Sequence, residues 1–331
     1  MFNNKNILII GGTGTIGYFL IKRILKENPN TIRIYSRDEH KQFLLKEELI
    51  DFNNIRFLIG DVRDKERLNR AMKNIDIVFN LAALKHVPSC EYNPFEAVKT
   101  NILGTQNVIE CAMENNVKQM IYTSSDKAVS PTNTMGATKL LAERLISSAY
   151  YARGHSDTIF ASVRFGNVLF SRGSVIPLFK EQIIKNKVIT ITEPEMTRFM
   201  MSPDEAVDLL IKATKIATGG EVFVLKMPVL KLIDLAEVTI QKVCEKEKID
   251  PKSIKIKNIG LRPGEKLYEE LMSEDEADKA LDIDDMYVIK PLYREYNEVI
   301  GKKIQLSYSS KDKKILTKKE IEEVFIKYNL L

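Results

Sequence analysis

The residues between 123 and 143 carry the clearest capacity for acid–base chemistry. Asp126 and Lys127 are adjacent in the sequence, so a carboxyl group and an amine lie side by side. A carboxyl group can give a proton and a neutral amine can take one, which makes the pair a candidate general acid and base. Lys139 follows on the same segment, one helical turn after Met135, whose thioether has no proton to exchange. The alternative is that Asp126 and Lys127 form an ordinary surface ion pair.

A glycine-rich turn near the amino terminus predicts a dinucleotide-binding unit. Residues 6–10 are almost wholly apolar, as in a parallel strand buried on both faces, and apolar residues at helical spacing follow the turn. Strand, glycine turn and helix in this order make the pattern specific, because the main chain can then approach a pyrophosphate that faces the helix amides. A βαβ unit without a nucleotide is the alternative. We expect cofactor contacts from Gly11, Thr13, Gly14, Thr15, Ile16 and Gly17.

The end of the second expected strand, residues 31–35, indicates which dinucleotide binds. Enzymes that prefer NAD usually place a carboxylate there for the ribose 2′-hydroxyl, whereas this chain has Ser36 followed by Arg37. A hydroxyl and a guanidinium suit a 2′-phosphate, and Lys41 is close enough in the sequence to assist. The sequence therefore favours NADP. The alternative is an exposed Arg37 with Asp38 turned inward to bind NAD.

Strands and helices alternate along the chain, which predicts an α/β fold with a doubly wound parallel Rossmann sheet. Further strands are expected at residues 55–60, 75–80 and 119–123. Ligands bind at the carboxyl ends of the strands in such sheets, and Asp126 and Lys127 follow the last of these strands directly. The other residues that we expect near the cofactor are Asp61 and Val62 beside the adenine, then Ala82, Ala83, Lys85 and Lys139.

Two lobes are expected. We predict a nucleotide-binding domain over residues 1–165 and a smaller, substrate-binding lobe mainly over residues 166–331. Residues 221–225 read as a strand, so the segment from about 205 to 227 is expected to return to the first domain.

Length and composition fit an enzyme with a sizeable core. The chain has 331 residues with 44% hydrophobic content, and its formal net charge of +5 is spread along the sequence, which argues against a nucleic-acid partner. Cys90, Cys111 and Cys244 are far apart and have no metal-binding spacing, so we expect reduced thiols, no metal and a cytoplasmic location. No signal peptide or long apolar span is visible, and membrane insertion is not expected.

Several separated motifs together resemble one family, the UDP-N-acetylglucosamine 4,6-dehydratases that invert C5, within the extended short-chain dehydrogenases/reductases. The likeness covers roughly residues 5 to 290 and is specific because the motifs agree in order. Beside the glycine turn they are AALKHVP (82–88), TNILGTQNV (100–108), SSDKAVSPTN (124–133), VRFGNVLFSRGSVIPLF (163–179), EMTRFMMSPDEAV (195–207) and GLRPGEKLYEELM (260–272).

The resemblance implies a transient oxidation. Hydride leaves C4 of the sugar for the nicotinamide, which acidifies the C5 proton, and water is then eliminated. In this family the lysine of the Asp-Lys pair, here Lys127, is thought to remove the C5 proton, while Asp126 protonates the departing C6 hydroxyl. Hydride returns to C6 and a proton to the opposite face of C5, so no net oxidation results. Similar enzymes open routes to capsular, flagellar and other surface sugars.

The two roles conflict electrostatically. Both groups must be neutral to act, yet neighbouring opposite charges favour the ionised form of each. We expect burial and the positive nicotinamide to lower the pKa of Lys127, and we expect Asp126 and Lys127 to titrate as a coupled unit.

Met135 departs from the superfamily pattern Tyr-x-x-x-Lys, in which the phenol exchanges the proton of the substrate hydroxyl. Capsule-type relatives also carry methionine there, so the change is compatible with activity. The step without an assigned residue is removal of the O4 proton, for which Asp126, Ser125, Thr134 or a water held by Lys139 remain open. Lys139 matches the lysine that holds the nicotinamide ribose; an exposed helix lysine is the alternative.

The second lobe is expected to bind the UDP part of the substrate. Arginines from distant segments can clamp a diphosphate in bidentate fashion, although each could instead form an internal ion pair. His86, beside Lys85, is either a sugar contact or a structural histidine. The expected substrate contacts are Lys85, His86, Asn167, Arg172, Ser174, Arg198, Arg262 and Glu265.

Three functions remain open. A 4,6-dehydratase acting on UDP-N-acetylglucosamine is favoured by Asp126 and Lys127, because a UDP-sugar C4 epimerase needs neither a C5 base nor a C6 acid. A noncatalytic NADP-binding protein, in which Met135 fills a pocket, is the third. Relatives assemble through helix bundles, which predicts a homo-oligomer between dimer and hexamer.

Overall fold

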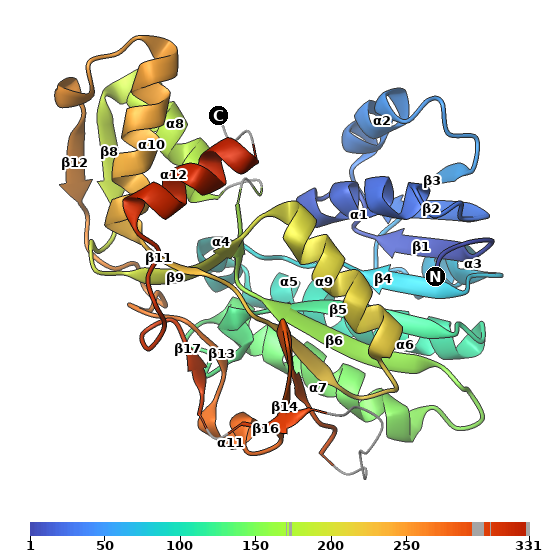
Figure 1. Ribbon diagram of the computed structural model, residues 1–331. Coiled ribbons are helices and arrows are strands. Elements are labelled where there is room, and N and C mark those ends of the chain that lie inside the picture. Colours follow the sequence, from blue (N-terminus) through green and yellow to red (C-terminus); the bar gives the residue numbers. More distant parts are fainter. Residues whose placement is uncertain (170, 172–173, 293–300, 305, 329–331) are drawn as a thin grey trace.

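A ten-stranded sheet forms the centre of the protein (Figure 1). The computed structural model describes residues 1–169, 171, 174–292, 301–304 and 306–328. The first part of the sheet is parallel, and each of its first five strands along the chain is a short run rich in apolar residues that is followed by a helix. In sheet order its strands are β3 (Ile55–Ile59), β2 (Thr31–Ser36), β1 (Asn6–Ile10), β4 (Ile77–Asn80), β5 (Gln119–Ser125), β6 (Ile159–Phe165) and β10 (Val222–Leu225).

Helices cover both faces of this sheet, so the predicted doubly wound parallel fold is confirmed. Alternate residues of β1 point to opposite faces, and Ile7 and Ile9 join one core cluster while Leu8 and Ile10 join the other. The first face is covered by α1 (Thr15–Leu25), α2 (Glu39–Glu48) and α9 (Pro203–Ile216). The second is covered by α3 (Lys65–Met72), α6 (Gly104–Glu114) and α7 (Thr134–Ala152).

The far edge of the sheet contains strands that the sequence pattern did not predict. Beyond β10 the sheet continues antiparallel through β15 (Met286–Ile289), β14 (Ala280–Ile283) and β16 (Lys302–Lys303). The parallel pairing of β10 with β6, together with the contact of α9 with α1, shows that the chain returns to the sheet after residue 202. The domain boundary near residue 165 stays a prediction.

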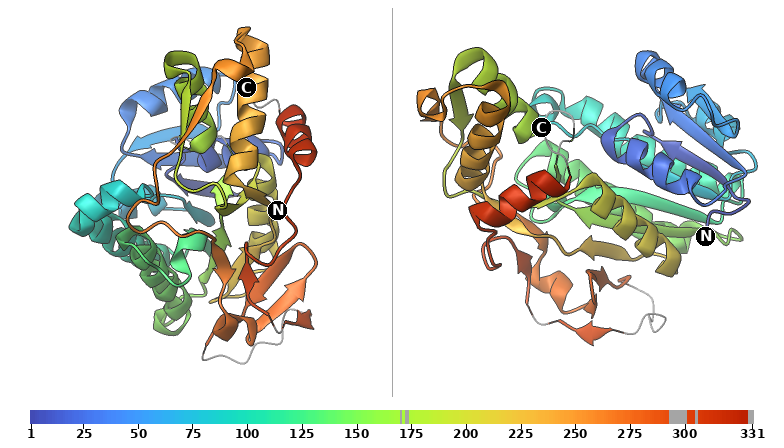
Figure 2. Two further views of the ribbon diagram at one scale, coloured as in Figure 1. Left: turned by 90° about the vertical axis from the view of Figure 1, so that its left-hand side faces the viewer. Right: turned by 45° about the horizontal axis from the view of Figure 1, so that its top comes forward.

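A second layered unit lies beside the carboxyl ends of the strands. Strand β8 (Val188–Ile191) packs with α8 (Val175–Asn186) and α10 (Leu232–Glu247) around one apolar cluster, and the exposed β12 (Lys255–Asn258) pairs with β8 in parallel. Helix α12 (Lys318–Lys327) rests on α10 through Ile321 and Phe325. Figure 2 shows α8 and α10 together at one end of the molecule, across from α1 and α2.

A buried ion cluster ties β6 and α7 to the last third of the chain. Arg164, at the end of β6, is 1% exposed and donates to Glu143 of α7 through Nε (3.0 Å) and Nη2 (2.5 Å). Its Nη1 donates to Glu276 of α11 (Glu274–Ala277) at 2.8 Å and to the Leu271 carbonyl at 2.9 Å. The guanidinium thus fixes the segment before β14 against the sheet.

Removing one carboxylate from this cluster should destabilise the fold. We expect Glu143→Gln to lower the free energy of unfolding by about 3 kcal/mol, because a buried guanidinium loses a charged partner. Urea unfolding measures the change. Glu181→Gln, in an exposed pair with Lys185, is the matched control and should leave the midpoint unchanged. Equal midpoints for the two variants would contradict a stabilising role for the cluster.

Candidate active site

A cavity of about 1120 Å³ lies over the carboxyl ends of the central strands, between them and the second layered unit. Ligand pockets span roughly 300–1,000 Å³, so this cavity lies just above that range and can hold a large ligand such as a dinucleotide. Its walls come from segments far apart in the sequence. They include residues 10–17, 35–41, 60–62, 81–88, 123–139, 165–176, 198–200 and 262–269, not every residue within each range.

The glycine turn forms one end of the cavity and fits a pyrophosphate. Gly11 has a φ of +78°, and a Cβ there would lie 2.9 Å from the main-chain nitrogen of Ala82, so only glycine is accommodated. Gly14 is the N-cap of α1 and has no side chain to cap the first turn. All six residues expected from this turn, and also Asp61, Val62, Ala82 and Ala83, border the cavity.

The tip of β2 presents a hydroxyl and a guanidinium to the cavity. Ser36 accepts a hydrogen bond from Thr13 at 3.1 Å, and the half-exposed Arg37 lies 3.6 Å from Asp61. Asp38 instead caps α2: it accepts from the Lys41 main-chain nitrogen at 2.9 Å and pairs with the Lys41 ammonium. The carboxylate beside the expected ribose site is therefore engaged by the helix.

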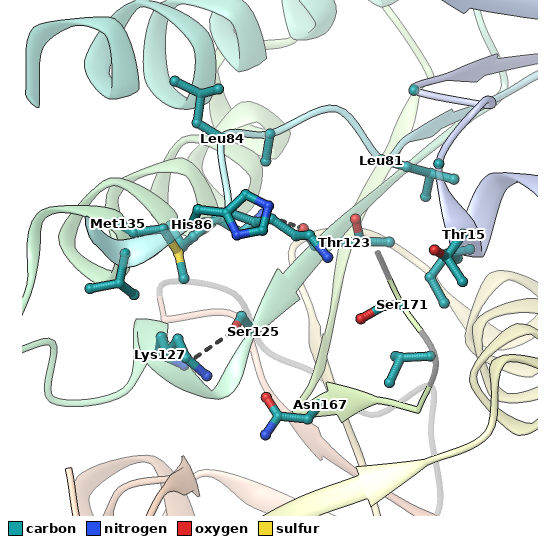
Figure 3. A pocket seen from close by; sticks show the side chains of 18 of the residues that line it. Thr15, Leu81, Leu84, His86, Thr123, Ser125, Lys127, Met135, Asn167 and Ser171 are labelled. Atoms are coloured by element: carbon teal, nitrogen blue, oxygen red, sulfur yellow. Dashed lines mark hydrogen bonds between the residues drawn. The ribbon is translucent and has the colours of Figure 1, made fainter. Parts of the chain in front are cut away.

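The acid–base pair begins a single helical turn, η2 (Asp126–Ala128), directly after β5. Lys127 borders the cavity, as Figure 3 shows, and its Nζ lies 3.0 Å from Asp126 Oδ1. Asp126 is fully buried behind it and also accepts from the Ser125 hydroxyl at 2.6 Å and the Lys127 main-chain nitrogen at 2.9 Å. Asp126 and Lys127 are thus an internal pair and not a surface ion pair.

A carboxyl group that the sequence reasoning missed completes this cluster. Glu269 is 3% exposed, borders the cavity, and places Oε1 3.6 Å from Lys127 Nζ. Burial raises the pKa of Glu269; the charge of Lys127 opposes the rise and that of Asp126 adds to it. Glu269 lies in the quoted motif at 260–272, and its place in that motif was the available signal.

The predicted direction of the Lys127 pKa shift was wrong. Burial alone would lower this pKa, as expected, but the charges of Asp126 and Glu269 outweigh it and raise the pKa. The sequence showed only the neighbouring carboxylate and not the second one, which explains the error. The structure therefore holds Lys127 as an ammonium between two carboxyl groups.

Lys139 lies on α7 and is buried, so it is not an exposed helix lysine. Its Nζ donates to the Thr123 carbonyl at 2.6 Å and lies 4.2 Å from the centre of the Tyr122 ring. Desolvation lowers its pKa to about 7, and the charge of Glu143 opposes this only in part. Lys139 borders the cavity where an amine could contact ribose hydroxyls.

Met135 borders the cavity one turn before Lys139 and packs against Cys90 and Ala97. Figure 3 shows its side chain near His86, across from Lys127. Among the side chains considered for the O4 proton, Ser125 borders the cavity, whereas Asp126 and Thr134 do not.

The expected substrate contacts differ in how free their side chains are to bind a ligand. Arg198 is buried and its guanidinium donates to main-chain carbonyls of Thr197 at 2.7 Å and Lys266 at 2.8 Å, so it shapes the wall more than it offers a diphosphate clamp. Arg172 lies outside the described residues. The others border the cavity: Lys85, His86, Asn167, Ser174, Arg262 and Glu265.

Other expected features can be checked over the described part of the chain. No group of acidic, histidine or cysteine residues there could hold a metal ion. Cys90, Cys111 and Cys244 are free and buried. Among the described helices, none combines the length and the apolar character that a membrane span requires.

Comparison with known proteins gives matches over most of the chain. A family model described as polysaccharide biosynthesis protein matches residues 7–291. A Methanocaldococcus jannaschii protein named uncharacterized membrane protein is 53% identical over 98% of this chain and 96% of its own length. The inverting UDP-N-acetylglucosamine 4,6-dehydratase of Campylobacter jejuni is 44% identical, with 88% and 84% covered. A UDP-glucose 4-epimerase of Rickettsia bellii is 43% identical, with 98% and 96% covered. The X-ray structure of Pen from Bacillus thuringiensis is 52% identical, with a TM-score of 0.96 and 100% and 99% covered.

The buried amine of Lys139 should make stability depend on pH. Its pKa is about 7 in the folded protein and near the ordinary value of 10.5 when unfolded, so the unfolded chain binds more protons between these values. The free energy of unfolding should then rise with pH across that window, by up to about 1.4 kcal/mol per pH unit. Lys139→Met should flatten this rise in urea unfolding at pH 7 and pH 9.5. Lys46→Met, at an exposed position of α2, should keep it; a rise unchanged in Lys139→Met would contradict the assignment.

Proposed function

The chain belongs to the polysaccharide biosynthesis protein family, and on this premise we propose that it removes water from UDP-N-acetylglucosamine with inversion at C5. The product is a UDP-2-acetamido-2,6-dideoxy-4-hexulose for surface polysaccharide or glycan synthesis. The observation that supports this most directly is the position of the Lys127 amine. It lies just beyond the carboxyl end of β5, beside the buried carboxyl groups of Asp126 and Glu269, and borders the cavity.

The chain's own residues provide the acid–base chemistry of the elimination. In its neutral amine form Lys127 takes the C5 proton, and the C6–O bond breaks. Asp126, which does not itself border the cavity, supplies through the Ser125 hydroxyl the proton with which the hydroxyl leaves as water. Lys139 holds the ribose hydroxyls of the cofactor. A nicotinamide bound there would supply reversible hydride transfer, from C4 and back to C6, with no net oxidation. A proton is then delivered to the face of C5 opposite to the one from which the first proton was removed, which inverts the configuration.

The O4 proton needs a route because Met135 cannot take it. Ser125 borders the cavity and its hydroxyl donates to Asp126 at 2.6 Å. A proton taken from O4 by Ser125 can pass to Asp126 as the hydroxyl gives up its own. The same carboxyl group is then protonated for the C6 hydroxyl in the following step.

A C4 epimerase is the runner-up, favoured by the similarity to the Rickettsia bellii enzyme. An epimerase has no use for an amine that removes the C5 proton, and the placement of Lys127 therefore supports the dehydratase. A noncatalytic NADP-binding protein is supported only by the methionine at position 135.

Incubation of the natural protein with NADP and UDP-N-acetylglucosamine in heavy water separates these functions. Loss of one water from the sugar nucleotide, with deuterium at C5, is the expected result. Unchanged mass with a new sugar would identify an epimerase. Inactivity with every candidate sugar nucleotide, combined with turnover by Met135→Tyr, would overturn the proposal that methionine suffices. NMR of the product reads the C5 configuration and any further epimerisation at C3.

We propose NADP as the cofactor, with NAD as the weaker alternative. Ser36, Arg37 and Asp38 all border the cavity, but the Asp38 carboxylate is engaged in capping α2 and pairing with Lys41, which leaves the hydroxyl and the guanidinium for a 2′-phosphate. Arg37→Ala should weaken NADP binding about tenfold or more and leave NAD binding within about twofold, since one charge-assisted contact is worth about 1.5–3 kcal/mol. Isothermal titration with each dinucleotide checks this, with Lys46→Ala as control. An equal loss for both dinucleotides would contradict it.

A UDP-sugar partner, a homo-oligomer and a cytoplasmic location complete the proposal. Arg262 and Glu265 border the cavity and supply a donor for the diphosphate and an acceptor for the uridine ribose. Oligomer size and location stay predictions.

A further inference from the structure

A third ionisable side chain, that of Glu269, lies beside the acid–base pair and comes from a distant part of the chain. Glu269 just precedes β13 (Glu270–Met272) and borders the same cavity as Lys127. We propose that Glu269 is a positioning residue that holds the Lys127 ammonium and sets the pH at which this amine becomes a base. The inference deepens the proposed dehydration and rests on it.

The main chain of Glu269 is fixed on both sides, so its carboxyl group has a defined place. Its nitrogen donates to the Ser310 hydroxyl at 2.9 Å, and the Ser310 nitrogen donates back to the Glu269 carbonyl at 2.9 Å. The fully buried Ser310 is also hydrogen-bonded to Thr197 at 2.9 Å. Such anchoring is what a residue that positions another side chain requires.

Lys127 lies between two carboxyl groups, of which only that of Glu269 belongs to a residue bordering the cavity. Asp126 Oδ1 is 3.0 Å from its Nζ and is already engaged by the Ser125 hydroxyl and the Lys127 main chain. Glu269 Oε1 is 3.6 Å from the same nitrogen and borders the cavity, whereas Asp126 does not. Within the described residues, Glu269 Oε2 and Asp126 Oδ2 are buried and have no hydrogen-bond partner. Buried oxygens of this kind are costly unless a ligand or a proton completes them.

The other charges around Glu269 do not replace its effect on Lys127. Arg198 Nε lies 3.8 Å from Glu269 Oε1, and Lys266 is a further cation that acts on this carboxyl group. Both are positive, as Lys127 is, and Arg198 lowers the Lys127 pKa. The negative charges that keep the amine protonated are therefore those of Asp126 and Glu269.

Neutralising Glu269 should make Lys127 a base at lower pH. An opposite charge within about 4–6 Å shifts a pKa by roughly 1–3 units, so Glu269→Gln should move the acid-side midpoint of the kcat–pH profile down by about one unit or more. Glu269→Asp should restore the midpoint toward that of the natural protein. Glu270→Gln is the control, because this adjacent side chain does not border the cavity. A uniform loss of kcat with an unchanged midpoint would mean a purely structural role and would overturn the inference.

A second readout does not need turnover. Lysine labelled with ¹³C at Cε gives one signal per residue, and the signal missing from Lys127→Met identifies Lys127. Its titration midpoint should fall in Glu269→Gln and stay unchanged in Glu270→Gln, measured with NADP bound and again without it. If the natural protein releases no water, the proposed function fails, and this titration alone decides the role of Glu269. An unchanged Lys127 midpoint in Glu269→Gln would sink the inference even in an active dehydratase.

Discussion

One partly buried ammonium, that of Lys127, lies beside two buried carboxyl groups and is the constraint on which the site depends. Lys127 follows β5 at the carboxyl ends of the parallel strands, where ligands bind in such sheets, and Asp126 beside it is fully buried. Glu269 reaches the same amine from a distant segment of the chain. Buried charges are stable only when they are paired, so this cluster links the nucleotide-binding sheet to the segment that carries Glu269.

The surrounding fold keeps that amine in place through close packing. A Cβ at Gly136 of α7 would lie 2.2 Å from the Lys127 carbonyl, so the absence of a side chain lets the helix approach η2 directly. The same helix carries Met135 and Lys139 into the cavity, and through Glu143 it binds the buried Arg164. Helix α7 and the strands beside it thus hold together the cavity wall, the acid–base pair and the segment that Arg164 binds.

Local patterns in the sequence predicted the parts of this arrangement that are local. Apolar runs and the glycine turn predicted the first five strands, and adjacency revealed Asp126 and Lys127. Contacts between distant segments were not predictable: β14 to β16 extend the sheet antiparallel, and Arg198 directs its donors to main-chain carbonyls. The direction of the Lys127 pKa shift was missed for the same reason, because it depends on Glu269, whose proximity only the folded chain shows.

The most direct test of the account replaces Lys127 by methionine, a side chain of similar length without an amine. The variant should bind NADP as the natural protein does, yet release no water from UDP-N-acetylglucosamine and take up no deuterium from heavy water at C5. Water loss at the natural rate in Lys127→Met, with cofactor binding intact, would contradict the assignment of this amine as the base.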